Sequence, residues 1–278
     1  MNLQMELTNK CNLSCQECPN HLMKRERKNM TMEVLETILY DYINPLENKQ
    51  AELGYPPTII LHKDGEPLLY PDLRYAMRKI ADLRPEFRFN LYTNGLFLTQ
   101  GFIDFLGSLP NQIWLMISFH FHNHAGKPND YSKLDALMEK VLNAPKIPNL
   151  DIIFTSHVTR LSKKDDLNTW AMIWKSKVPK DRLTIGINDC INPWTGLIKE
   201  DNCAAFSGCP YADFGHIFIG VTGNVIPCCM DLEEKLIIGN IMVDSPEDIY
   251  SRLDKFYSIM REKKDIPVLC RKCMGEET

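Results

Sequence analysis

The sequence has no long hydrophobic run and no excess of positive charge. None of its apolar stretches approaches the roughly 18 residues needed to cross a bilayer. The segment 1–11 has neither the basic region nor the apolar core of a signal peptide, so we expect a cytoplasmic protein. With a formal net charge of -4 and a pI near 6.0, a broad phosphate-binding surface is excluded, and we expect no nucleic-acid or membrane partner. Internal repeats and low-complexity tracts are also missing.

Cysteine, in contrast, is abundant. Ten cysteines in 278 residues are hard to explain as disulfides in a compartment that keeps thiols reduced. Their spacing therefore points to metal or redox chemistry. A short basic run, Lys24–Lys28, is interrupted by Glu26. It predicts a solvated loop, or else a contact with an anionic group on a substrate or partner.

The first two thirds of the chain alternates strand-like and helix-like segments. The predicted strands are Leu3–Leu7, Thr58–His62, Phe87–Thr93, Ile113–Phe119, Leu150–Val158 and Leu183–Ile187. The predicted helices are Thr31–Ile43, Asp72–Leu83, Thr99–Leu106, Lys133–Leu142 and Lys164–Lys177. Such alternation predicts parallel βα units, in an open doubly wound sheet or in a barrel. Because candidate residues repeatedly follow strands, one barrel mouth shared by all strands is favoured.

The pattern changes near residue 186. From Cys190 onward the chain is rich in Cys, Gly, Pro and Asn, with a hairpin-like pair, Ile217–Val221 and Asn224–Pro227, and a helix at Pro246–Arg261. We predict two domains, 1–187 and 188–278, of which the second is small and held together partly by metal.

Three cysteines directly follow the first predicted strand. Cys11, Cys15 and Cys18 have the spacing C-x3-C-x2-C. Three thiolates on one loop can bind a [4Fe–4S] cluster and leave one iron open for a small molecule. A zinc site, the alternative, needs a fourth ligand, and His21 is the nearest candidate.

The triad closely resembles that of the radical S-adenosylmethionine (SAM) superfamily, over roughly residues 3–190. The resemblance implies an α/β fold with a partial (β/α)6 TIM-like barrel and SAM bound to the open iron. It also implies reductive cleavage of SAM to a 5′-deoxyadenosyl radical, which removes a hydrogen atom from a C–H bond of the substrate. We expect a flavodoxin- or ferredoxin-type protein as electron donor.

Further positions match the cofactor contacts of this family. The segment 64–67, Asp-Gly-Glu-Pro, resembles the family's GGEP segment with an aspartate in place of the first glycine. The resemblance implies cofactor-binding roles for Gly65, Glu66, Pro67, Thr93, Asn94, Ser118 and His120. The residue before the third cysteine is often apolar in the family but is Glu17 here, which puts the adenine contact in doubt. His120, His122 and His124 alternate, and could bind a metal or be polar residues of the barrel mouth.

A second cysteine set lies near the C-terminus. Cys209, Cys228, Cys270 and Cys273 have the spacing C-x13-G-x4-C…C-x2-C, which from spacing alone fits zinc or [4Fe–4S]. The pattern resembles the twitch domain, the short form of the SPASM extension. The resemblance implies an auxiliary [4Fe–4S] cluster that is fully ligated by these four cysteines.

Three cysteines remain. Cys190 and Cys203 are expected to be buried apolar thiols. Cys229 directly follows a predicted ligand, and two adjacent ligands to one cluster are sterically awkward, so it is expected to be free. In related peptide epimerases the second cysteine of a similar Pro-Cys-Cys gives a hydrogen atom to the substrate radical. We therefore take Cys229 as the candidate catalytic residue.

Several functions remain open. The chain resembles twitch-domain aminocyclitol dehydrogenases and radical epimerases, which implies a small polar substrate such as a sugar, aminocyclitol or aminoglycoside. The first hypothesis is epimerisation with Cys229 as hydrogen-atom donor. The alternatives are dehydrogenation of a secondary alcohol with the auxiliary cluster as electron acceptor, modification of a ribosomal peptide, and a non-catalytic iron–sulfur electron carrier. Trp194, where relatives are expected to carry polar substrate contacts, is unlike a base.

Overall fold

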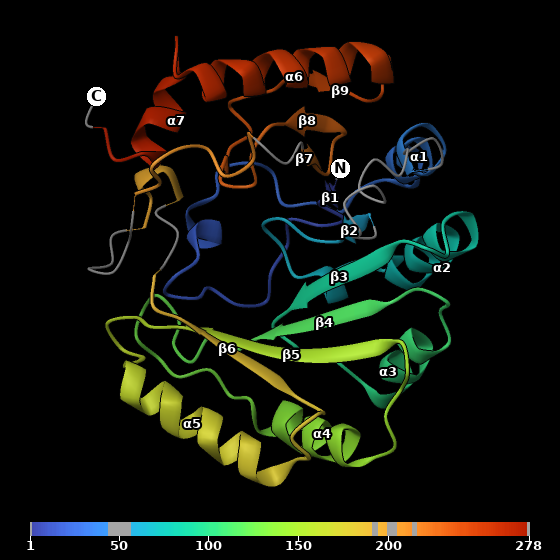
Figure 1. Ribbon diagram of the computed structural model, residues 1–278, viewed down its shortest axis with the longest axis vertical. Helices are drawn as coiled ribbons and strands as arrows, with labels where there is room; N and C mark the ends of the chain where they lie inside the picture. Colours follow the sequence, from blue (N-terminus) through green and yellow to red (C-terminus); the bar gives the residue numbers. More distant parts are fainter. Residues whose placement is uncertain (1, 44–56, 191–193, 199–204, 213–215, 277–278) are drawn as a thin grey trace.

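The structure is a computed structural model that describes residues 2–43, 57–190, 194–198, 205–212 and 216–276 (Figure 1). Cys203 falls outside these residues. Within them, no helix combines the length and the apolar character that a membrane span requires.

A nine-stranded sheet runs through the molecule, in the order β6-β5-β4-β3-β2-β1-β7-β8-β9. Its strands are β1 (Asn2–Met5), β2 (Thr58–Ile60), β3 (Arg88–Thr93), β4 (Ile113–Ser118), β5 (Leu150–His157), β6 (Thr184–Asn188), β7 (His216–Ile219), β8 (Asn224–Ile226) and β9 (Gly239–Asn240). β1 to β6 pair in parallel with their neighbours. The predicted α/β partial barrel is therefore confirmed.

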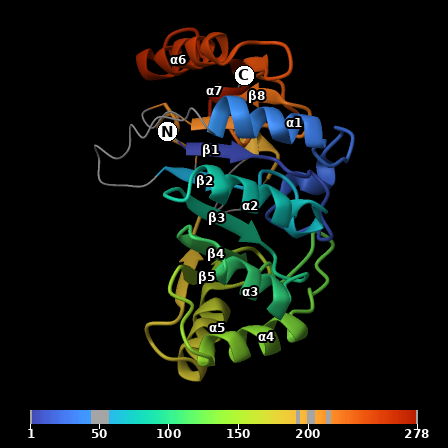
Figure 2. The same ribbon diagram turned by 90° about the vertical axis from the view of Figure 1, so that its right-hand side faces the viewer.

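Helices cover one face of this sheet (Figure 2). They are α1 (Met32–Thr37), continued by a π-helix η2 (Ile38–Ile43), α2 (Leu73–Leu83), α3 (Gln100–Gly107), α4 (Ser132–Asn143) and α5 (Lys164–Lys177). The hydroxyl of Thr31 accepts a hydrogen bond from the Val34 N–H, and that of Thr99 accepts one from the Phe102 N–H. Both are N-caps that satisfy free donors of the first helical turn.

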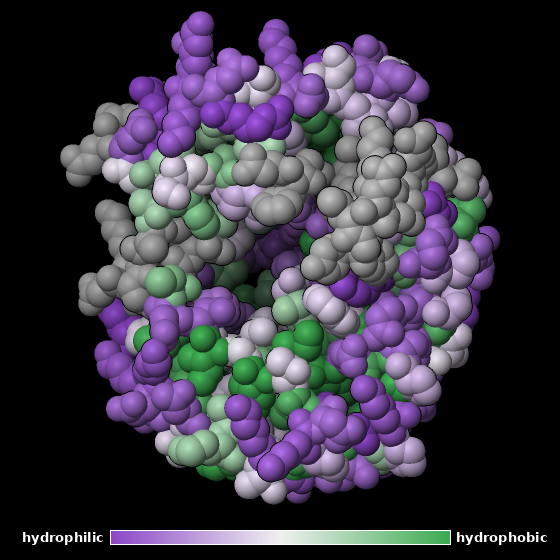
Figure 3. Space-filling view, in the orientation of Figure 1, coloured by the Kyte–Doolittle hydropathy of each residue, from purple (hydrophilic) through white to green (hydrophobic). Residues whose placement is uncertain are grey.

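Burial alternates along the strands, which fixes their two faces. In β4, Ile113, Leu115 and Ile117 are completely buried against the helices, while the residues between them are only half-buried. β5 shows the same alternation. Because successive side chains of a strand point to opposite faces, the half-buried positions face the barrel lumen. Figure 3 shows a hollow near the centre of the molecule, between strands β4–β6 and the C-terminal part.

The C-terminal part extends the same sheet. β7 pairs in parallel with β1, and β8 and β9 follow in antiparallel pairing, before α6 (Pro246–Glu262) and α7 (Val268–Cys273). The sequence predicted the β7–β8 hairpin and α6, but not β9, α7 or the pairing with β1. An isolated hairpin is marginally stable, and the free edge of β1 gives it a partner.

Candidate active site

The cysteine triad lies on a loop that is held by the segment after β4. Cys15 is 6% exposed, and its backbone pairs with that of Asn123 in an isolated antiparallel β-bridge. The Gln16 N–H donates to the His122 carbonyl at 3.2 Å. On the other side, the His124 N–H donates to the Ser14 carbonyl at 2.7 Å. The loop is therefore fixed to the barrel mouth by backbone hydrogen bonds, independently of any ligand of its cysteines.

The three thiols share one site. Burial raises the pKa of Cys11 and Cys15 and raises that of Cys18 to about 12, and the pKa of Cys15 is also raised by Cys18 and Cys11. A metal that binds here must displace the thiol protons, as iron–sulfur ligation does.

Zinc fits this site less well than a cluster. His21 is turned away: its Nδ1 lies 2.9 Å from the Cys18 carbonyl oxygen and its ring stacks on His124. A Zn–S length of about 2.3 Å places the sulfurs of one zinc ion about 3.8 Å apart. Among the described residues, no three cysteine sulfurs lie within 4.8 Å of one another. A cubane does not require such close sulfurs, because each thiolate binds a different iron.

Glu66 is fixed at the end of β3. Its carboxylate accepts hydrogen bonds from the Thr93 hydroxyl at 2.6 Å, the Asn94 N–H at 2.8 Å and the Leu68 N–H at 3.0 Å. The Asn94 amide also donates to Asn12 of the cysteine loop. Burial raises the pKa of Glu66. Thr93 and Asn94, predicted as direct cofactor contacts, thus orient Glu66 and link it to the cysteine loop.

Gly65 is required by a close backbone approach. A Cβ atom at this position would overlap the Thr8 carbonyl oxygen and lie 2.8 Å from the Lys10 carbonyl oxygen. The Glu66 N–H donates to that same Lys10 carbonyl at 2.8 Å. The close approach is therefore to the chain that leads into the cysteine loop, and it brings Glu66 beside the triad.

A carboxylate–imidazole pair occupies the mouth beside the triad. The Glu17 carboxylate lies 2.6 Å from His120 Nδ1, and the His157 ring stacks in parallel on His120 with a centroid distance of 6.1 Å. Burial lowers the pKa of His120, but Glu17 outweighs this and the net pKa is raised. Burial lowers the pKa of His157 to about 4. The sequence treated Glu17 only as a departure from the family pattern and missed His157.

The row of alternating histidines does not converge on one ion. His122 contacts Ser162 and His124 contacts the Ser14 carbonyl oxygen, away from His120. Ser118, another predicted cofactor contact, lies with its hydroxyl 3.2 Å from the Thr155 hydroxyl. The histidines are therefore polar residues of the mouth, the second of the two interpretations above.

The four C-terminal cysteines line one cavity. Cys209, Cys228, Cys270 and Cys273 surround it, and most of its other lining residues are apolar, such as Phe256. Burial raises the pKa of Cys270 to about 12, and Cys209 and Cys273 raise it further. Four thiols around one largely apolar cavity fit a fully ligated cluster.

Cys229 does not line that cavity. Its Sγ lies 2.9 Å from the hydroxyl oxygen of Tyr211. On the barrel side, the pKa of Tyr92 is raised by burial and by the nearby Cys229 thiol. Because Tyr92 alternates with the buried Leu91, Cys229 lies next to the lumen-facing side of β3.

Two expectations were wrong. Cys190, expected to be buried, is exposed, because it lies two residues beyond the end of the edge strand β6. The basic run is not simply a solvated loop: Arg25 is 13% exposed and pairs with Glu6 at 3.0 Å, Asp64 at 2.8 Å and Glu234 at 2.6 Å. It meets carboxylates of its own chain, which come from the barrel and from the C-terminal part.

The contacts of Asp64 explain why an aspartate stands where the family segment has a glycine. Its carboxylate pairs with Lys63 as well as with Arg25, and Lys63 also donates to the Asp231 carbonyl at 3.1 Å. Where the family has a glycine, this chain thus has an anchor for two cations that reach the C-terminal part.

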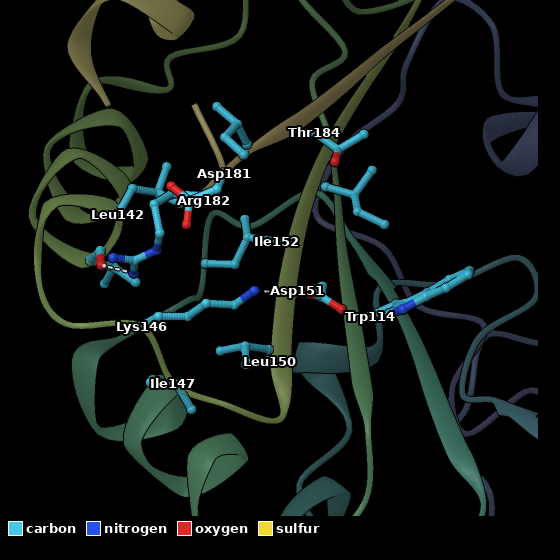
Figure 4. Close-up of a pocket in the computed structure, with 13 residues that line it drawn as sticks. Trp114, Leu142, Lys146, Ile147, Leu150, Asp151, Ile152, Asp181, Arg182 and Thr184 are labelled. Carbon is cyan, nitrogen blue, oxygen red and sulfur yellow. Dashed lines mark hydrogen bonds and ion pairs between the residues drawn. The ribbon is translucent and has the colours of Figure 1, made fainter. Parts of the chain in front are cut away.

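A separate cavity lies at the opposite end of the strands. Its volume is about 190 Å3, and it lies at the amino-terminal ends of β5 and β6 (Figure 4). Lys146 points toward Asp151, with 3.5 Å between the charged atoms. Its distance along the strands from the cysteine triad excludes it as the cofactor site.

Comparison with known protein families covers both parts of this site. Residues 5–126 match the model of the radical SAM superfamily, and residues 209–274 match the SPASM model, described as an iron–sulfur cluster-binding domain. The chain therefore contains a radical SAM domain and a SPASM domain. A radical SAM domain holds a [4Fe–4S] cluster and SAM, and a SPASM domain holds auxiliary iron–sulfur clusters.

Individual relatives agree with this assignment. The chain is 25% identical over 277 residues to an S-adenosyl-L-methionine-dependent 2-deoxy-scyllo-inosamine dehydrogenase from Niallia circulans, covering 98% of this chain and 91% of the relative. The crystal structure of BtrN in complex with AdoMet and 2-DOIA superposes with a TM-score of 0.65 at 22% identity, covering 97% of this chain and 91% of that one. The structure of histidine-tagged anSMEcpe with bound AdoMet superposes with a TM-score of 0.65 at 16% identity, covering 100% of this chain and 91% of that one.

Proposed function

We propose that this radical SAM enzyme dehydrogenates a secondary alcohol of a small polar substrate such as a cyclitol, aminocyclitol or sugar. The first support is the full-length similarity to a dehydrogenase of an aminocyclitol. The observation that carries the proposal is the Glu17–His120 pair, because dehydrogenation needs a proton acceptor beside the reacting carbon. This is the second hypothesis drawn from the sequence, and it now takes precedence over epimerisation.

The assignment of ligands follows the two cysteine sets. We propose that Cys11, Cys15 and Cys18 hold the first cluster, and that Cys209, Cys228, Cys270 and Cys273 hold the second. When bound, these groups supply hydrogen-atom abstraction by a 5′-deoxyadenosyl radical and a one-electron acceptor. A flavodoxin- or ferredoxin-type donor would reduce the first cluster.

The chain's own residues would bind and orient the reactants. Glu66, held by Thr93 and Asn94, would accept the ammonium group of SAM, and Gly65 and Pro67 fix its turn. By the resemblance, Ser118 and His120 would contact the bound SAM. The alcohol must lose one hydrogen atom, then one electron and one proton. Because His120 Nδ1 is bonded to Glu17, Nε2 of the neutral imidazole is the atom left to accept that proton, and this requires a pH above the raised pKa of His120.

Epimerisation by Cys229 is the second candidate. Cys229 is not among the residues that line the cavity of the four cysteines, and its thiol raises the pKa of the lumen-facing Tyr92, which supports a thiol that is free of the second cluster. A thiol there could return a hydrogen atom to a substrate radical, and the stereocentre would invert without net oxidation.

One experiment separates the two reactions. Cluster-loaded enzyme is given SAM, a reductant and 2-deoxy-scyllo-inosamine in deuterated water, and the product is analysed by mass spectrometry. For dehydrogenation we expect a mass loss of two, no deuterium on carbon, and full activity in Cys229→Ala. The matched control is Cys190→Ala, which removes an exposed thiol.

The opposite pattern supports epimerisation. A product of unchanged formula with one deuterium on carbon, lost specifically in Cys229→Ala, contradicts dehydrogenation. A failure to release 5′-deoxyadenosine with any cyclitol or sugar, but release with a peptide, contradicts both.

A further inference from the structure

An arginine without an acidic partner lies inside the barrel. In β3, Phe89 and Leu91 are completely buried against the helices, so Arg88, Asn90 and Tyr92 face the lumen. Strands β1 to β6 contain one arginine or lysine, which is Arg88, and one carboxylate, which is Asp151. A lone guanidinium on the inner wall of a barrel needs an explanation.

The guanidinium of Arg88 is oriented but not neutralised. It stacks on the Trp114 ring at 3.7 Å from the centroid, and its Nη2 donates to the Thr58 hydroxyl at 2.9 Å. Its Nε is buried without a partner, and in the described part of the chain no carboxylate forms an ion pair with it. Burial lowers the pKa of Arg88 because no carboxylate opposes it. Of its five N–H donors, most are therefore unused.

Asn90 is a second unsatisfied group on the same face. It is 8% exposed, its Oδ1 is buried without a partner, and no described residue hydrogen-bonds to its side-chain amide. It lies in register with Trp114 on β4, directly beside the ring on which Arg88 stacks. Buried amides are nearly always paired in folded proteins, so a ligand is the natural partner.

The nearby carboxylates are already paired with side chains of this chain, and this indicates the charge of the ligand. Asp151 contacts Lys146 and accepts from Gln112 at 2.9 Å. At the mouth, Glu6 pairs with Arg25 and Glu17 with His120. No described carboxylate on the inner wall is left for an ammonium group, whereas Arg88 and Asn90 offer donors to an anion.

We propose that Arg88 and Asn90 form a subsite for an oxyanion, a carboxylate or a phosphate, at the end of the substrate remote from the reacting carbon. A stacked guanidinium is pre-organised for bidentate binding of such groups. Because Trp114 lies in register with Asn90, the stacked guanidinium of Arg88 is about two residues, or about 7 Å along the strand, from Tyr92, which suits a cyclitol phosphate or a sugar acid. The inference rests on the proposed function only in placing the substrate in the lumen.

Calorimetric titration of the SAM-bound, cluster-loaded enzyme tests this subsite without turnover. The probes are myo-inositol 1-phosphate, D-glucuronate, myo-inositol and 2-deoxy-scyllo-inosamine. We expect at least one anionic probe to bind tenfold or more tightly than myo-inositol. This preference should disappear in Arg88→Gln and weaken in Asn90→Ala. The two anionic probes distinguish a phosphate site from a carboxylate site.

The matched control is Arg78→Gln, because Arg78 also stacks on an aromatic ring, that of Phe105, but at the outer surface of helix α2. It should keep the full preference for the anion. If Arg88→Gln does not fold, Arg88→Lys is used and should keep a reduced preference. Equal binding of anionic and neutral probes, no binding of either anion, or an unchanged preference in Arg88→Gln overturns the proposal. The proposed function is tested separately, by the mass of the product in the turnover experiment described above.

Discussion

Glu17 and His120 form a buried pair whose charge state depends on pH. Glu17 raises the pKa of His120 above the ordinary value of 6.5, against the effect of burial. The pair therefore stabilises the fold fully between about pH 4.5, the ordinary pKa of a glutamate, and pH 6.5, because Glu17 lies below and His120 above its ordinary pKa. This contribution is lost as the pH rises through the raised pKa of the folded state.

Replacing Glu17 by Gln should remove that contribution. We expect the melting temperature of the cluster-loaded protein to fall relative to wild type by an amount equivalent to about 1–3 kcal/mol at pH 6, and by less at pH 8.5. The measurement is anaerobic thermal unfolding at the two pH values. Glu139→Gln, which breaks an exposed pair with Lys177, should change stability little at either pH. A pH-independent effect of Glu17→Gln would show that the pair is not titrating.

At the scale of elements, the loops at the carboxyl ends of β1, β2 and β3 are fitted to one another. Gly65 after β2 packs against the carbonyl oxygens of Thr8 and Lys10 after β1, and Glu66 reaches the end of β3. The three loops therefore position the cysteine triad and the proposed SAM ligand together.

Gly65→Ala should disturb this arrangement strongly. The added Cβ overlaps backbone atoms that cannot move aside, so we expect a loss of several kcal/mol in the free energy of unfolding and a reduced iron content after reconstitution. Chemical denaturation and iron analysis measure the two effects. In Gly101→Ala, on helix α3, the nearest atom is Arg74 Nη2 at 3.9 Å, so that variant should gain about 0.5–1 kcal/mol. Equal behaviour of both variants would contradict the close packing.

At the scale of the whole molecule, Arg25 joins the barrel to the C-terminal part. Its guanidinium lies among Glu6, Asp64 and Glu234, whose side chains are at most 5% exposed. The Arg25 Nε also donates to the Leu232 carbonyl at 2.6 Å. A desolvated cation that bridges the two parts keeps the C-terminal cysteines in a fixed position relative to the mouth.

Arg25→Met should leave buried carboxylates without a counter-ion. We expect a loss of about 3–5 kcal/mol in the free energy of unfolding. Urea denaturation of the cluster-loaded protein measures it. Arg252→Met, which breaks a half-exposed pair with Asp244, should cost less than about 1 kcal/mol. A similar small cost in both variants would argue that Arg25 is solvated and does not join the two parts.

The sequence by itself determined the elements and the two cysteine sets. Hydrophobic periodicity and the caps at Thr31 and Thr99 are local signals, and spacing such as C-x3-C-x2-C is a property of the chain alone. These were enough for the α/β barrel, the radical SAM chemistry and the SPASM domain.

Only the tertiary structure decided which distant residues meet. It showed that Glu17 pairs with His120, 103 residues away, and that β7 pairs with β1. It also showed that Arg25, expected at the surface, is largely buried and forms ion pairs with both parts of the molecule. It also left Arg88 facing the lumen without a partner. Contacts of this kind depend on how strands and loops are stacked in space, and neither composition nor short-range spacing records them.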